Sequence, residues 1–170
     1  MKYDRRIERA VDRFRRAGID IRPISESPSV DEIESTIGGE LPEVYRALIT
    51  RYSFPVLDLG PIELFSNLGD GTADDITFVP FRDPILSRWL IQQGYFHFAR
   101  LTSDSYDPVC FGIRPTASPK EPLSVVRFDH EAILQEEATV RRVQFAESFL
   151  GLLEGDAMDS QAHARNPFNQ

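Results

Sequence analysis

The order of sequence patterns in this chain of 170 residues predicts an α+β fold, with helices at both ends and strands between them. Apolar residues recur at helical spacing over residues 5–17 and again over residues 145–153. The runs between these segments are short, rich in β-branched and aromatic residues, and separated by turn-forming residues. We expect one domain over residues 1–155, followed by a polar tail without periodicity over residues 156–170.

The first expected element is a basic amphipathic helix within residues 1–18, which ends at Gly18. Two interpretations are open: a helix packed on the domain with a solvated arginine face, or a basic arm that binds nucleic acid or a membrane. Acidic residues interleaved with the arginines favour the packed helix. Its apolar positions follow the i, i+3, i+4, i+7 spacing and are Ile7, Ala10, Val11 and Phe14.

Two further helices are expected between residues 30 and 52. Ser29 and Glu32 have the spacing of a capping box, in which each side chain satisfies a backbone N–H of the other. Gly38 suits the left-handed C-terminal cap of the first helix, and Pro42 suits the first position of the second. The apolar stripes are Val30, Ile33 and Ile37 in the first helix, and Val44, Tyr45, Leu48 and Tyr52 in the second.

The middle and end of the chain predict short strands around one more helix. A helix over residues 84–93 is expected to begin after Asp83 and to stop at Gly94. The expected strands cover residues 62–65, 76–79, 95–99, 108–112, 123–128 and 140–144. The residues expected to be largely buried are Leu48, Phe98, Val109, Phe111, Val126, Phe149 and Leu153.

Four motifs occur in an order that is similar to one known family. The first is E-x-x-I-G-x-x-L-P-x-x-Y-x-x-L-I, which begins at Glu34. The others are Asp107-Pro108-Val109-Cys110-Phe111, then Val125-Val126-Arg127-Phe128-Asp129-His130-Glu131, then Ala146-Glu147-Ser148-Phe149-Leu150-Gly151-Leu152-Leu153. From about Val30 to Leu153 the chain resembles the SUKH superfamily, the Smi/Knr-like domains. It departs from the family where Arg51-Tyr52-Ser53-Phe54-Pro55 replaces an Asn-Gly turn, and where Ser103-Asp104-Ser105-Tyr106 replaces a Gly-Asp turn.

The resemblance implies a twisted, mainly antiparallel sheet with helices packed against one side. It also implies a binding module without enzymatic activity. Bacterial members resemble immunity proteins that bind and neutralise a cognate toxin of a polymorphic toxin system, often a nuclease or deaminase. The alternative is a regulatory or scaffold domain of the cell-wall-regulator type that binds a cellular partner. The resemblance concerns fold and binding, so the functional step is an analogy.

Composition limits the class of protein. A hydrophobic content of 41% and a charged content of 27% are ordinary for a globular protein, and no run approaches the about 18 apolar residues of a membrane helix. The charged N-terminal segment predicts no secretory signal. The single cysteine, Cys110, excludes an internal disulfide and fits a reducing compartment, so we expect a cytoplasmic protein.

Charge is unevenly distributed. Residues 1–18 hold seven basic and three acidic side chains, net +4, so the rest of a chain with a total charge of −8 carries −12. An acidic body argues against direct nucleic-acid binding and suits a basic protein partner, although acidity can also serve solubility alone. The carboxylates expected to contact a partner lie in two loops and are Asp70, Asp74, Asp75, Asp104 and Asp107.

No catalytic or cofactor motif is expected. Cys110 lies between apolar residues and is interpreted as a core thiol, and His97 is expected to be half-exposed, opposite its phenylalanine neighbours. The Asp129-His130-Glu131 run could ligate a metal or act in acid–base chemistry with Asp104 and Asp107, but a strand end and turn is the simpler interpretation. Residues 69–75 lack the ligand pattern of a calcium loop and the Lys-Ser/Thr of a phosphate loop. The sequence therefore predicts no metal, no cofactor and no catalytic residue.

Overall fold

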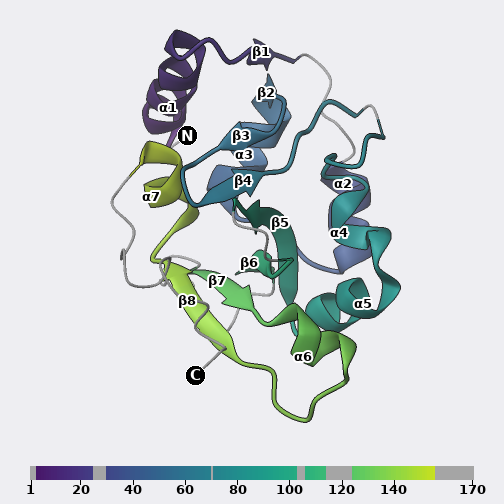
Figure 1. The fold of residues 1–170 in the computed structure, drawn as a ribbon. Coiled ribbons are helices and arrows are strands. Elements are labelled where there is room, and N and C mark those ends of the chain that lie inside the picture. Colours follow the sequence, from purple (N-terminus) through teal and green to yellow (C-terminus); the bar gives the residue numbers. More distant parts are fainter. Residues whose placement is uncertain (1–2, 25–29, 70, 103–105, 114–123, 156–170) are drawn as a thin grey trace.

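The computed structural model describes residues 3–24, 30–69, 71–102, 106–113 and 124–155. Its centre is a six-stranded sheet in which every pairing is antiparallel and each strand pairs with its neighbour in the chain (Figure 1). The predicted α+β class is confirmed. The sheet strands are β3 Leu57–Asp58, β4 Ile62–Leu64, β5 Tyr95–Leu101, β6 Pro108–Gly112, β7 Val125–Phe128 and β8 Arg142–Ala146, and a separate pair is formed by β1 Arg22–Pro23 and β2 Tyr52–Ser53.

Helices lie at both ends of the described chain and also between strands. They are α1 Asp4–Arg16, α2 Val30–Ile37, α3 Glu43–Arg51, α4 Val79–Arg82, α5 Pro84–Gln92, α6 His130–Leu134 and α7 Phe149–Glu154. Of these, α4 and α5 lie between β4 and β5 in the chain, and α6 lies between β7 and β8. No helix in the described part of the chain is both long enough and apolar enough to cross a membrane.

One face of the sheet carries the main core, which is aromatic. The ring of Tyr45 from α3 lies 5.8 Å from Phe98, 4.9 Å from Phe111 and 5.2 Å from Phe149, in edge-to-face geometry. Phe98 and Phe111 stack across neighbouring strands at 4.5 Å. Each such pair adds about 0.5–1.5 kcal/mol beyond the area it buries. The predicted buried set is confirmed in full: Leu48, Phe98, Val109, Phe111, Val126, Phe149 and Leu153 are each at most 3% exposed.

A second, smaller apolar cluster lies on the other face of the sheet. Side chains alternate between faces along a strand, so Cys110 and Val126, which are register partners, point away from the Phe111 side. They pack with Leu90 of α5 and Ile133 of α6. Helices therefore cover both faces: the expected helices pack against one side, and α5 and α6 also cover the other.

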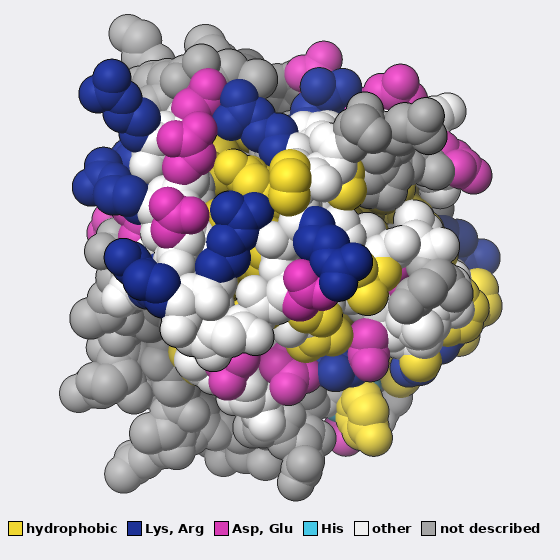
Figure 2. Space-filling model, turned by 90° about the horizontal axis from the view of Figure 1, so that it is seen from above, with side chains coloured by type: hydrophobic (Ala, Val, Ile, Leu, Met, Phe, Trp, Pro, Cys, Tyr) yellow, Lys and Arg dark blue, Asp and Glu magenta, His cyan; other side chains and the backbone are white. Residues whose placement is uncertain are grey.

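The basic helix α1 packs on the domain, beside α7 (Figure 1). Its apolar positions Ile7 and Val11 are buried. Arg13 donates to the carbonyl oxygens of Leu153 (2.7 Å) and Glu154, so its guanidinium caps the negative end of α7. Seen from above in Figure 2, the Lys and Arg side chains on this side of the molecule alternate with Asp and Glu, as expected for a solvated face.

For α1, α2, α3 and α5, the capping and helix-breaking residues of the sequence predicted boundaries within a residue or two of the observed ones. Asp83 caps α5 by accepting hydrogen bonds from the backbone N–H groups of Ile85 and Leu86, and Gly38 adopts φ +65° after α2, both as predicted. Pro42 is the N-cap of α3 rather than its first helical residue. Ser29, the expected partner in a capping box, lies outside the described residues.

Three expectations about the elements are wrong. Residues 76–78 form a turn and Val79 begins α4, because Asp75 O accepts from the N–H groups of Phe78 and Val79 and Pro80 has no N–H for a sheet. Residues 145 and 146 finish β8, so the closing helix begins at Phe149 and not at 145. Residues 129–131, expected as a strand end and turn, are the N-cap and first two residues of the short helix α6, which continues to Leu134.

Candidate functional site

The first predicted contact loop is a structural turn. Asp75 is fully buried, and its carboxylate accepts hydrogen bonds from the backbone N–H groups of Gly69 and Thr77, both at 2.8 Å. Asp74 is half-buried and accepts from Arg100 at 2.6 Å. As a surface contact for a partner, the prediction for Asp75 is wrong, because its charge is used to shape the loop. Asp70 and Asp104 lie outside the described residues.

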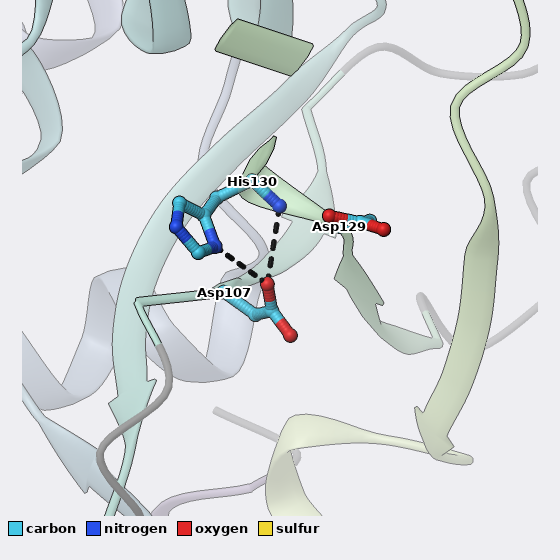
Figure 3. A group of neighbouring side chains, drawn as sticks. All are labelled: Asp107, Asp129 and His130. Carbon is cyan, nitrogen blue, oxygen red and sulfur yellow. Dashed lines mark hydrogen bonds and ion pairs between the residues drawn. The ribbon is translucent and has the colours of Figure 1, made fainter. Parts of the chain in front are cut away.

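The second loop leads to a buried ionic network. Asp107, just before β6, is 3% exposed, and Arg127 of β7 is 5% exposed. Oδ2 of Asp107 accepts from Nε of Arg127 at 2.8 Å and also from its Nη2. Oδ1 accepts from the backbone N–H of His130 at 3.1 Å and bonds to Nδ1 of the same imidazole at 2.9 Å (Figure 3). Asp107 is thus also unavailable as a surface contact.

This network determines the protonation state of its carboxylate. Burial on its own raises the pKa of Asp107, but the hydrogen bonds from His130 and Arg127 outweigh it and hold the pKa below its ordinary value. The group is therefore a carboxylate at neutral pH. Its counter-charge is the Arg127 guanidinium directly beside it.

The network joins two of the motifs seen in the sequence. Arg127 lies opposite Val109 in the β6–β7 register, which places its side chain near the start of β6 and Asp107. Asp129 then caps α6 by accepting from the N–H groups of Glu131 (3.0 Å) and Ala132 (3.2 Å), and this cap presents His130 as the first helical residue. Arg127 was missed by sequence reasoning. Its signal was a charge within a four-residue apolar strand, since a buried arginine requires a counter-charge.

Asp107, Asp129 and His130 bring ligand atoms within 4.8 Å of one another, a grouping that could hold a metal ion. Their hydrogen bonds argue against that use. Both oxygens of Asp107 already accept hydrogen bonds, and one oxygen of Asp129 caps α6. The guanidinium of Arg127 would also repel a cation beside Asp107. The arrangement fits a fixed imidazole better than a metal centre.

The same geometry bears on acid–base chemistry. When Nδ1–H donates to Asp107, Nε2 of His130 carries the lone pair, and the side chain is 22% exposed. Among the described residues, no serine, threonine or cysteine donates a hydrogen bond to His130, so the nucleophile of a hydrolytic triad has no counterpart there. The enzyme hypothesis rests on Asp104, Asp107, Asp129 and His130; Asp104 lies outside the described residues, and the contacts of the other three add no support to it.

The remaining candidates, Cys110 and His97, are cross-strand neighbours inside the second face of the sheet. Cys110 is fully buried, and burial raises the pKa of its thiol well above its usual range. His97 is 8% exposed rather than half-exposed, and burial lowers its pKa to about 4. Phe65 packs edge-on against its ring at 4.9 Å, which explains the burial.

One exposed aromatic residue lies against the network. Tyr106 is 76% exposed, and its ring lies 5.9 Å from the imidazole of His130. Sequence reasoning passed over it, since its neighbours in the chain are polar.

Comparisons with models of known families, with curated proteins and with solved structures find no match to this chain.

Proposed function

We propose that this chain is a non-enzymatic protein-binding module, and specifically an immunity protein that binds and neutralises a cognate toxin of a bacterial polymorphic toxin system. The non-enzymatic binding role is supported by candidate reactive groups that are buried inside the fold. Asp75 and Asp107 are buried acceptors of internal hydrogen bonds, and Cys110 is a buried neutral thiol. The immunity role rests on the resemblance of the ordered motifs to SUKH immunity proteins.

Charge supports a basic partner. A nuclease or deaminase that binds phosphates presents a cationic face, and the residues after position 18 carry a net charge of −12. Opposite fields accelerate association and discourage partners of like charge. The proposal places binding in the cytoplasm, where a toxin would be neutralised by occlusion in a stoichiometric complex.

The alternative is a regulatory or scaffold domain that binds a cellular protein. The same observations on buried reactive groups support it equally. The two functions differ in whether the partner is harmful to the cell when it is expressed alone, so toxicity of the partner separates them.

The experiment begins with an affinity-tagged copy of this chain in its native cell. We expect one stoichiometric partner, retained at low salt and released faster at high salt, because screening weakens a long-range electrostatic attraction. The identified partner is then expressed in a naive host with and without this chain. Growth arrest relieved by an equimolar amount of this chain supports immunity, whereas a stoichiometric partner without toxicity supports the scaffold. Recovery of no stoichiometric partner would contradict both functions.

A further inference from the structure

The exposed surface above the ionic network has the composition of a contact site. Tyr106 is the most exposed large hydrophobic residue among the described ones, at 76%, and Leu134 is 40% exposed. Leu134 follows His130 by four positions in α6, so both lie on the same side of that helix. We call Tyr106, His130 and Leu134 the Tyr106 face. An exposed tyrosine with an apolar neighbour resembles the centre of a protein interface more than a solvated surface, because tyrosine is enriched at such centres.

We propose that the Tyr106 face is the surface through which this chain binds its partner, and that the partner offers an apolar side chain flanked by lysine or arginine. The inference rests on the proposed function in one respect, namely that the chain binds a protein.

Rigidity of the imidazole is the first argument. His130 is held through both its backbone N–H and its Nδ1 by one carboxylate oxygen, and the other oxygen is held by Arg127. Burying such an ion pair costs desolvation that apolar residues of similar size would avoid, so stability alone explains it poorly. Its effect is to fix the orientation of a surface side chain. A group that is ordered before binding loses less entropy on binding.

The chemistry of the partner follows from what the face presents. In the neutral state Nε2 of His130 is a hydrogen-bond acceptor, so it suits a donor on the partner. Exposed carboxylates border α6 at its first turn and just after its end, and these are Glu131, Glu136 and Glu137. An apolar centre with an acidic rim is complementary to an apolar side chain between basic residues.

Other exposed apolar residues lack this support. Leu68 is 49% exposed and Phe78 is 42% exposed, both near the Asp75 turn. The buried carboxylate of Asp75 accepts from the N–H groups of Gly69 and Thr77 and from the Thr77 hydroxyl, so the side chain that it orients there is a hydroxyl already used as a donor and not an imidazole. Phe78 therefore serves as a matched control, an exposed aromatic residue outside the Tyr106 face.

The test places a photo-crosslinking benzoylphenylalanine at position 106, 78 or 9 of the full chain in its native cell. Arg9 is an exposed position on α1 and controls for contacts of the basic helix. We expect one cross-linked partner from position 106 and none from positions 78 and 9, with lysine or arginine near the cross-linked segment of the partner. Cross-linking from position 78 or 9 but not from 106 overturns the inference and leaves the proposed function standing. A failure to cross-link at all three positions overturns the inference, while the tagged purification decides separately whether a partner exists.

Affinity then measures the contribution of the face. Tyr106→Ala is expected to weaken binding of the identified partner by at least about tenfold and Leu134→Ala by a smaller factor, while Phe78→Ala leaves it unchanged. Because Tyr106, Leu134 and Phe78 are all exposed, the three variants should melt at nearly the wild-type temperature, so a loss of affinity is not a loss of fold. Wild-type affinity of Tyr106→Ala and Leu134→Ala overturns the inference.

Discussion

Two buried regions of this protein lie within five residues of each other and use opposite chemistry. The aromatic core around Phe111 holds rings packed edge-on and stacked, whereas the network around Asp107 holds an ion pair and an imidazole. Both depend on β6, since Asp107 immediately precedes this strand and Phe111 lies within it. The core stabilises the fold through area and close packing, which are not directional. The network contributes direction, because each hydrogen bond fixes one atom of His130 or Arg127.

The largest effect is expected from the aromatic core. Phe149→Ala removes a ring that contacts Tyr45, Phe98 and Phe111 and leaves a cavity, so it should lower the free energy of unfolding by about 3–5 kcal/mol. Urea denaturation checks this against Phe78→Ala, which removes an exposed ring and should change little. Equal stability of the two variants would contradict the assignment of Phe149 to the core.

The network is expected to respond differently, because its members depend on one another. Arg127→Met removes the guanidinium that bonds to the buried carboxylate and should cost about 3–4 kcal/mol. The double variant Asp107→Leu/Arg127→Met should cost less than the sum of the two single variants, since no buried charge then loses its counter-charge. A double-mutant cycle in urea measures the difference. Strict additivity would mean that the two side chains do not act as a pair.

A third effect comes from His97, the buried imidazole of the second face. Its pKa is about 4 in the folded state, below the about 6.5 of an exposed histidine, so the fold favours the neutral ring. Above about pH 6.5 the His97 imidazole is neutral in both the folded and the unfolded chain, so its burial does not lower the free energy of unfolding there. As the pH falls from about 6.5 to about 4 the unfolded chain takes up a proton and the folded chain does not, so stability falls by on the order of 3 kcal/mol.

Carboxylates titrate in nearly the same pH range, so the effect of His97 has to be measured as a difference between two proteins. The free energies of unfolding of the wild type and of His97→Leu are compared at pH 7 and pH 4. The free energy of unfolding of the wild type minus that of the variant should be smaller at pH 4 than at pH 7 by on the order of 3 kcal/mol, since the variant has no group to protonate at this position. A difference that does not change with pH would contradict the burial of a neutral imidazole.

Sequence predicted the fold best where structure is determined locally. Helices α1, α2 and α5 were found because their apolar spacing and their caps, such as Asp83 and Gly38, lie within a few residues. Residues 76–79 have the composition of a strand, but the carbonyl oxygen of Asp75 and the missing N–H of Pro80 make them a turn followed by the first residue of α4. The start of α7 was misplaced because residues 145 and 146 belong to β8, and pairing with β7 is not visible locally.

The candidate site was harder to predict for a related reason. Sequence identified Asp75, Asp107 and His130 as residues of interest, but it could not show which carboxylates are buried. The burial of Asp75 depends on the N–H groups of Gly69 and Thr77, and that of Asp107 depends on Arg127 from another strand. Counting charges therefore predicted that Asp75 and Asp107 contact a partner, whereas in the fold both carboxylates are buried and accept hydrogen bonds from the same chain.

The smallest effect tests whether the core needs any polar group. Tyr45 is fully buried among aromatic rings, and its hydroxyl has no hydrogen-bond partner among the described residues. Burial raises the pKa of this hydroxyl well above its usual range, so it stays neutral. Tyr45→Phe keeps the ring and removes only the unsatisfied hydroxyl, whose desolvation costs the wild type roughly 1–3 kcal/mol unless the packing around it relaxes.

We therefore expect Tyr45→Phe to be neutral or to raise the free energy of unfolding by up to about 1 kcal/mol, the cavity left by the oxygen offsetting part of the gain. Thermal and urea denaturation at pH 7 measure it, and Tyr95→Phe is the control, since its hydroxyl accepts a hydrogen bond from Arg142 at 2.6 Å. A loss above about 1 kcal/mol in Tyr45→Phe would indicate that the hydroxyl is hydrogen-bonded inside the core. The aromatic core would then share with the Asp107 network a dependence on a directed polar contact, and the contrast between the two regions would be one of degree.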